Sequence, residues 1–79
     1  MISERDTILI VGKFFNDCLN FWLKDGKEYH EAFEFALSDA SKIKHDPFVP
    51  QGDLLDADAH RKCIEYIRER IKNENKNWI

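Results

Sequence analysis

The segment from residue 4 to residue 25 constrains the fold most, because its apolar surface is too wide for a helix that packs on one side only. When its residues are placed at steps of roughly 100° around a helix, the polar ones collect into one stripe: Lys13, Asn16, Asp17, Asn20 and Lys24. The apolar residues cover about 200°, twice the width typical of a surface helix. They are Ile8, Val11, Phe14, Phe15, Cys18, Leu19, Phe21, Trp22 and Leu23. Such a helix must be covered on more than one side.

Local signals place the ends of this helix and the start of the next. Ser3, with an acid three residues later, is a variant of the capping box and predicts the helix start. Gly26 suits the left-handed position that follows a helix, and Asp25 is a candidate cap for the helix after it. These signals predict a tight αα-hairpin. Gly12 predicts either a close helix crossing or a weak point, because glycine lowers helix propensity by about 1 kcal/mol relative to alanine.

A second amphipathic helix is predicted over residues 27–43. Its apolar stripe contains three alanines, whose small side chains allow close packing: Tyr29, Ala32, Phe33, Ala36, Leu37, Ala40 and Ile43. Phe35 breaks this pattern, since it falls on the outward face among charged residues. We expect Phe35 either to be covered by its charged neighbours or to belong to a binding surface.

Two prolines and a glycine end the second helix and define a loop over residues 44–54. Pro47 and Pro50 match the minimal P-x-x-P pattern of polyproline ligands. No arginine flanks the pattern closely, so we expect the residues between the prolines, Phe48 and Val49, to anchor the loop beneath the bundle instead.

A third helix is predicted over residues 55–74, and no segment alternates with the period of a β-strand. One face of this helix is apolar apart from a histidine, and it contains Ala57, His60, Ile64, Ile67 and Ile71, with Trp78 in phase. The chain is therefore predicted to be all-α and a single domain over residues 1–79. Its architecture would be a three-helix bundle made of the αα-hairpin, the proline-containing loop and the third helix.

The size and composition of the chain favour a small cytoplasmic protein that has reduced thiols. A chain of 79 residues buries only about 60% of the surface that its unfolded form exposes, so help from a partner or an oligomer is expected. The two cysteines are too few for a disulfide framework or a zinc site built on thiolates. The N-terminus has no signal-peptide pattern, and the most apolar segment is too polar for a membrane span.

The acids before the third helix suggest either a metal site or a helix cap. The calcium-loop pattern fails, because the sixth residue from Asp56 is Arg61 and the twelfth is Ile67. Asp56 and His60 stand one turn apart and are weak metal-ligand candidates. Capping by Asp53 or Asp56, with Asp58 beside the positive end of the helix dipole, explains these acids better.

Catalytic chemistry has little support in the sequence, so we expect no enzyme activity and no cofactor. His60 is expected to be partly buried and hydrogen-bonded on the apolar face. Cys63 lies three residues later, but a catalytic dyad also needs an activated thiolate, an orienting group and an oxyanion site. The three glycines are isolated and form no phosphate-binding loop.

Nucleic-acid binding is an alternative that depends on the last helix. Residues 61–79 carry six basic and three acidic residues, whereas residues 1–60 carry six basic and twelve acidic ones. Arg61, Arg68 and Lys72 share one side of the third helix, but Glu65 and Glu69 are close enough in sequence to pair with them. The acidic remainder of the chain would also repel phosphates.

The excess apolar surface favours a protein-binding role over the other classes. Candidate anchors are Phe14, Phe21 and Trp22 on the first helix and Phe35 on the second, because aromatic residues dominate interface hot spots. We expect a non-enzymatic module that binds or occludes another protein, as an inhibitor, immunity protein or adaptor does, or that forms a homodimer. Its acidity suits a basic partner surface.

Overall fold

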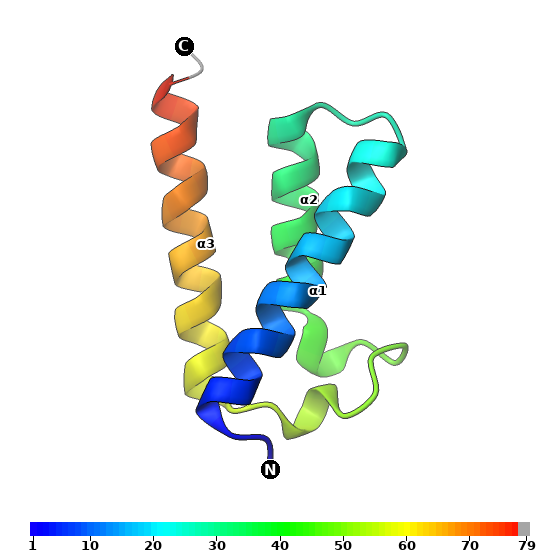
Figure 1. Cartoon of the computed structure of the whole chain (residues 1–79), viewed down its shortest axis with the longest axis vertical. Coiled ribbons are helices and arrows are strands. Elements are labelled where there is room, and N and C mark those ends of the chain that lie inside the picture. The colour runs from blue at the N-terminus through cyan, green and yellow to red at the C-terminus, as the bar shows by residue number, and fades with distance from the viewer. Residues whose placement is uncertain (78–79) are drawn as a thin grey trace.

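The computed structural model describes residues 1–77, with side chains through Asn73. This part of the chain consists of three α-helices and the segment that connects the second helix to the third. The helices are α1 (Glu4–Lys24), α2 (Tyr29–Ser41) and α3 (Ala57–Asn77), which run up, down and up (Figure 1). Two short 3₁₀ helices, η1 (Ile43–His45) and η2 (Gly52–Leu54), lie between α2 and α3. Residues 1–77 contain no strand. The predicted all-α three-helix bundle is confirmed.

The α1–α2 hairpin forms through the predicted signals, with one exception. The Ser3 hydroxyl accepts a hydrogen bond from the Asp6 amide at 3.1 Å. Gly26 has a φ of +99°, and the amides of Gly26 and Lys27 donate to the carbonyls of Leu23 and Trp22 at 3.1 and 3.2 Å, which is a Schellman motif. The prediction that Asp25 caps the second helix is wrong, because Asp25 ends α1 and α2 starts after Glu28 without a side-chain cap.

The core lies where the three helices meet, and α1 packs against both α2 and α3 as its wide apolar face predicts. Phe15 of α1 and Phe33 of α2 form its centre, with ring centroids 4.9 Å apart in an edge-to-face arrangement. The other buried members of the cluster are Val11, Ala36, Ala40, Ile43, Leu55, Ile64, Ile67 and Ile71. Alanines on α2 let the neighbouring helices approach closely.

The loop between α2 and α3 is anchored by one of the two residues predicted to do so. Val49 packs against the core, but Phe48 is 91% exposed, so the prediction for Phe48 is wrong. The carboxylate of Asp46 accepts a hydrogen bond from the Phe48 amide at 2.9 Å, and the Asp46 carbonyl accepts one from Val49 at 3.1 Å. This turn directs the Val49 side chain inward and the Phe48 side chain outward.

Close backbone packing occurs at Gly52 and not at Gly12. A Cβ atom added at Gly12 would meet nothing within 4 Å, so the predicted close crossing at Gly12 is absent. At Gly52 a Cβ atom would overlap the carbonyl group of Ile43. Gly52 is therefore required where η2 packs on η1.

Hydrogen bonds join the helices at the end of the bundle where α1 and α3 begin. Thr7 is fully buried, and its hydroxyl accepts a hydrogen bond from the Asp56 amide at 2.9 Å. The Lys44 ammonium donates to the Leu55 carbonyl at 2.9 Å. From this end, α3 and α1 separate toward the other end of the molecule (Figure 1). None of the helices within residues 1–77 is long and apolar enough to cross a membrane.

Candidate protein-binding surface

Three of the four predicted anchor residues meet on the surface of the α1–α2 hairpin. The Phe21 and Trp22 rings lie 5.1 Å apart in an edge-to-face arrangement, and the Trp22 and Phe35 rings lie 5.0 Å apart at an angle of 31°. Phe21 is 61% exposed and Phe35 43%. We call Phe21, Trp22 and Phe35 the aromatic cluster. It joins residues that lie 13 positions apart in the sequence.

A hydrogen bond holds Trp22 at the centre of the aromatic cluster. The indole Nε1–H donates to Asp39 Oδ2 on α2 at 2.9 Å, while the ring packs partly buried against the core. Because an indole with both its ring and its N–H satisfied has little freedom, contacts within the hairpin fix the position of Trp22.

Asp39 also suppresses the reactivity of the neighbouring thiol. The pKa of Cys18 is raised to about 11, first by burial and then by the charge and hydrogen bond of Asp39, because each disfavours the thiolate. Burial also raises the pKa of Cys63. Both thiols are therefore poor nucleophiles at neutral pH.

Acidic side chains border the aromatic cluster on α2. Glu31 and Glu34 line a shallow recess together with Phe35 and Ser38. Glu28, His30 and Glu31 can bring one ligand atom each within 4.8 Å of one another, and all three are exposed. We call Glu28, Glu31 and Glu34 the acidic rim. The sequence predicted that Phe35 lies among charged residues, but it did not single out these acids as a group.

One cation lies over the aromatic cluster. The Lys27 ammonium is 5.8 Å from the centroid of the Phe35 ring, within the range of a cation–π interaction. Its ion pair with Asp25 is long, at 4.0 Å. Lys27 follows the Schellman turn, so the geometry of the hairpin places it there.

The fourth predicted anchor, Phe14, does not belong to the aromatic cluster. It packs against the core and is partly buried. Its outer edge lines a separate shallow depression with Ile10, Lys13 and Asp17. Phe14 therefore contributes mainly to the core.

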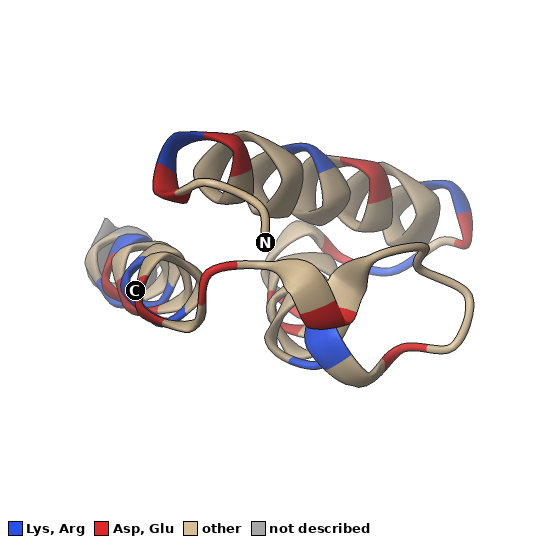
Figure 2. Ribbon diagram, turned by 90° about the horizontal axis from the view of Figure 1, so that it is seen from below, with Lys and Arg blue, Asp and Glu red and all other residues tan. Residues whose placement is uncertain are grey.

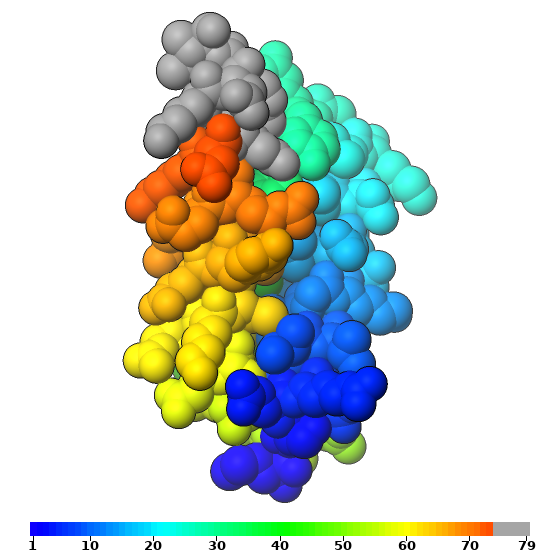
Figure 3. All heavy atoms as spheres, turned by 60° about the vertical axis from the view of Figure 1, so that its left-hand side comes forward, coloured from blue at the N-terminus to red at the C-terminus, as the bar shows by residue number. Residues whose placement is uncertain are grey.

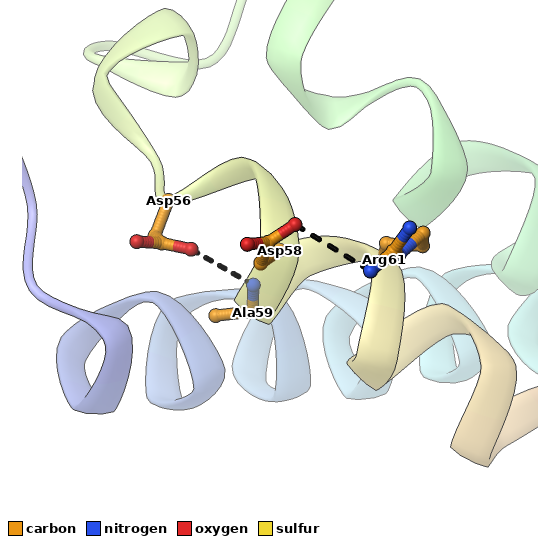
Figure 4. A network of polar contacts seen from close by, with 4 residues as sticks. All are labelled: Asp56, Asp58, Ala59 and Arg61. Carbon is orange, nitrogen blue, oxygen red and sulfur yellow. Dashed lines mark hydrogen bonds and ion pairs between the residues drawn. The ribbon is translucent and has the colours of Figure 1, made fainter.

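The weak metal-ligand candidates at the start of α3, Asp56 and His60, have structural roles. Asp56 Oδ1 accepts a hydrogen bond from the Ala59 amide at 2.9 Å, and Asp58 lies 3.5 Å from Arg61 (Figure 4). His60 is partly buried, and its Nε2 is 2.8 Å from the carbonyl oxygen of Ala40. The predicted cap by Asp56 and the predicted hydrogen bond of His60 are both confirmed.

The Cys63–His60 pair has no catalytic geometry. The Cys63 sulfur lies 4.0 Å from the carbonyl oxygen of Ile8, whereas the His60 imidazole is directed to α2. The two side chains thus serve different helix contacts.

Acids accompany the basic residues of α3. Arg61 pairs with Asp58 at 3.5 Å and Lys72 with Glu69 at 3.7 Å. Arg68 is exposed on the same helix. Acidic and basic residues are mixed on α3 rather than gathered on one face (Figure 2). The predicted partner Glu69 is confirmed for Lys72, while Arg61 uses Asp58 instead.

An apolar groove between α1 and α3 was not predicted. Ile8 and Tyr66 border it, with exposures of 44% and 66%, and Phe33 of α2 contributes to its lining. Figure 3 shows α1 and α3 side by side along this seam. Its remaining lining residues are Gly12, Phe15, Asn16, Cys63, Ile67 and Arg70.

Comparisons with protein-family models, curated proteins and solved structures found no match to this chain. The geometry of its own residues therefore carries the functional argument.

Proposed function

We propose that this protein is a non-enzymatic protein-binding module whose contact surface is the aromatic cluster. The observation that carries the proposal is the contact of the Phe21 and Phe35 rings, which are 61% and 43% exposed, with a hydrogen-bonded tryptophan between them. Phenylalanine and tryptophan bury large apolar areas when a partner covers them. A rigid arrangement reduces the entropy that binding must overcome.

The mode of action would be occlusion of a partner surface, as in an inhibitor, immunity protein or adaptor. Catalysis finds little support in the described residues, because both thiols have raised pKa values and His60 is hydrogen-bonded to the backbone of Ala40. Nucleic-acid binding finds less support than protein binding, because Arg61 and Lys72 have acidic neighbours. A metal-dependent role finds less support than either, because Asp56 caps α3.

Self-association is the second form of the proposal. The α1–α3 groove, bordered by exposed Ile8 and Tyr66, adds apolar surface away from the aromatic cluster. Light scattering across a range of concentrations would measure the mass in solution. A dimer that Phe21→Ser and Phe35→Ser abolish would identify the cluster as the interface between two copies.

The test for a different partner is a comparative capture experiment. The chain and its Phe21→Ser/Phe35→Ser variant are used as baits in extracts of the native cell, and bound proteins are identified by mass spectrometry. Both residues are exposed, so circular dichroism should show an unchanged fold. Phe48→Ser, which removes an aromatic ring that is 91% exposed in the loop between α2 and α3, is the matched control.

The proposal expects a protein that the wild type and Phe48→Ser capture and that the double variant loses. If every captured protein is retained equally by all three baits, and the wild type is a monomer, the aromatic cluster is not a binding surface.

A further inference from the structure

We propose that the aromatic cluster receives a basic segment of its partner, with a lysine or arginine of that segment placed over Phe35 and held by the acidic rim. This inference rests on the proposed function, and it specifies the chemistry of the partner.

The charge around Phe35 is strongly asymmetric. Residues 25–39 contain five acids, Asp25, Glu28, Glu31, Glu34 and Asp39, against one lysine, Lys27, and one histidine, His30, which lies 3.6 Å from Glu28. Glu31 and Glu34 line the same recess as the Phe35 ring. A surface of one sign raises the local concentration of partners of the opposite sign and speeds their association. It repels anionic membranes and nucleic acids for the same reason.

The Phe35 ring already contacts a cation. Lys27 occupies this position from within the chain, which demonstrates that the ring is accessible to an ammonium group. The Lys27–Asp25 pair is exposed and long, at 4.0 Å, and exposed pairs of this kind contribute little to stability. A partner cation can therefore displace Lys27 without breaking a strong interaction.

The spacing of the recess fits an extended contact along α2. Glu31 lies three and four positions before Glu34 and Phe35, and Ser38 lies four and three positions after them, so the four residues share one face of α2. A purely apolar partner would cover Glu31 and Glu34 and leave their carboxylates without water or a counter-charge, which is unfavourable. A segment that combines apolar and basic side chains satisfies both the rings and the acids.

The test uses three synthetic amphipathic peptides that differ only in their polar residue, which is arginine, the neutral arginine analogue citrulline, or glutamate. Binding is followed through the indole N–H signal of Trp22 in ¹H–¹⁵N NMR spectra, assigned with a Trp78→Phe variant. We expect the arginine peptide to shift this signal saturably. The citrulline peptide should bind at least about tenfold more weakly and the glutamate peptide not at all.

Two variants of the protein test the site itself. Glu31→Gln/Glu34→Gln should weaken binding of the arginine peptide by about tenfold and reduce its salt dependence. Lys27→Gln should strengthen it by about threefold, because the competing cation is gone. Glu65→Gln on α3 is the matched control and should change nothing.

Equal affinity for the arginine and citrulline peptides, or no shift of the Trp22 signal up to about 1 mM peptide, would overturn the inference. An unchanged affinity in Glu31→Gln/Glu34→Gln would do the same. Such peptide results do not contradict the proposed function if the Phe21→Ser/Phe35→Ser bait loses a protein that the wild type captures. Conversely, retention of every captured protein by that bait, with a monomeric wild type, overturns the proposed function itself.

Discussion

Thr7 provides the sharpest test of how the bundle is held together, because a single buried hydroxyl links the starts of two helices. The side chain is fully buried, and its Oγ1 accepts the Asp56 amide hydrogen at 2.9 Å. Thr7→Val keeps the shape of the side chain and removes the acceptor. The Asp56 amide, at the start of α3, then has no partner in the protein.

The expected cost follows from the full burial of Thr7 and the partial burial of Asp56. An unsatisfied buried donor costs about 1–3 kcal/mol, and the extra methyl group of valine offsets part of this. The contact is partly buried as a whole, so we expect a net loss of about 1 kcal/mol in the free energy of unfolding. For a domain of this size, the melting temperature should fall by about 4–8 °C.

Thermal unfolding followed by circular dichroism measures this change, and amide hydrogen exchange locates it. Exchange at Asp56 and in the first turn of α3 should accelerate in Thr7→Val. Thr7→Ser is the control: it loses a buried methyl group, worth about 0.8 kcal/mol, but should keep the Asp56 amide protected. A Thr7→Val protein that melts at or above the wild-type temperature would refute the reasoning.

Three further predictions concern packing and pH. Gly12→Ala should stabilise the protein by about 1 kcal/mol in urea denaturation, because alanine favours the helix and a Cβ atom meets nothing within 4 Å; a loss of stability would contradict this. Gly52→Ala should lower stability by about 1–3 kcal/mol, because its Cβ atom overlaps the Ile43 carbonyl; an unchanged urea midpoint would show that η1 and η2 can separate freely. The pKa of Cys18 is raised from 9.0 to about 11. The protonated thiol therefore stabilises the fold fully below pH 9, and this contribution is lost as the pH rises to about 11. The wild type should therefore lose stability relative to Cys18→Ala over that interval, and parallel pH profiles would exclude the effect.

The candidate surface could be predicted only in part. Phe35 was recognisable as an aromatic residue on a charged face, and Phe21 and Trp22 as members of an unusually wide apolar face. Their contact was not predictable, because it depends on how α1 and α2 are rotated and crossed. For the same reason the sequence could not distinguish Phe14 from Phe21. Both are phenylalanines on the wide apolar face of the first helix, but Phe14 packs partly buried against the core.

Local interactions determined the helices and their ends. Ser3, Gly26 and Asp56 act through hydrogen bonds or backbone angles that extend over about four residues. The sequence therefore predicted the roles of Ser3 and Gly26, and it gave Asp56 as one of two candidate caps. The apolar period likewise identified the faces of α2 and α3, except at their first residues, because Tyr29 and Ala57 are exposed. The order of elements and the all-α class followed from these local rules.

Tertiary structure decided every contact between residues far apart in sequence. It placed Gly52 against Ile43 and left Gly12 open, exposed Phe48 while burying part of Val49, and opened the groove between α1 and α3. It also stacked Trp22 on Phe35 beside Glu31 and Glu34. The physical reason is that the pattern of one helix defines which residues can face a neighbour, whereas the packing of all three helices defines which neighbour they meet.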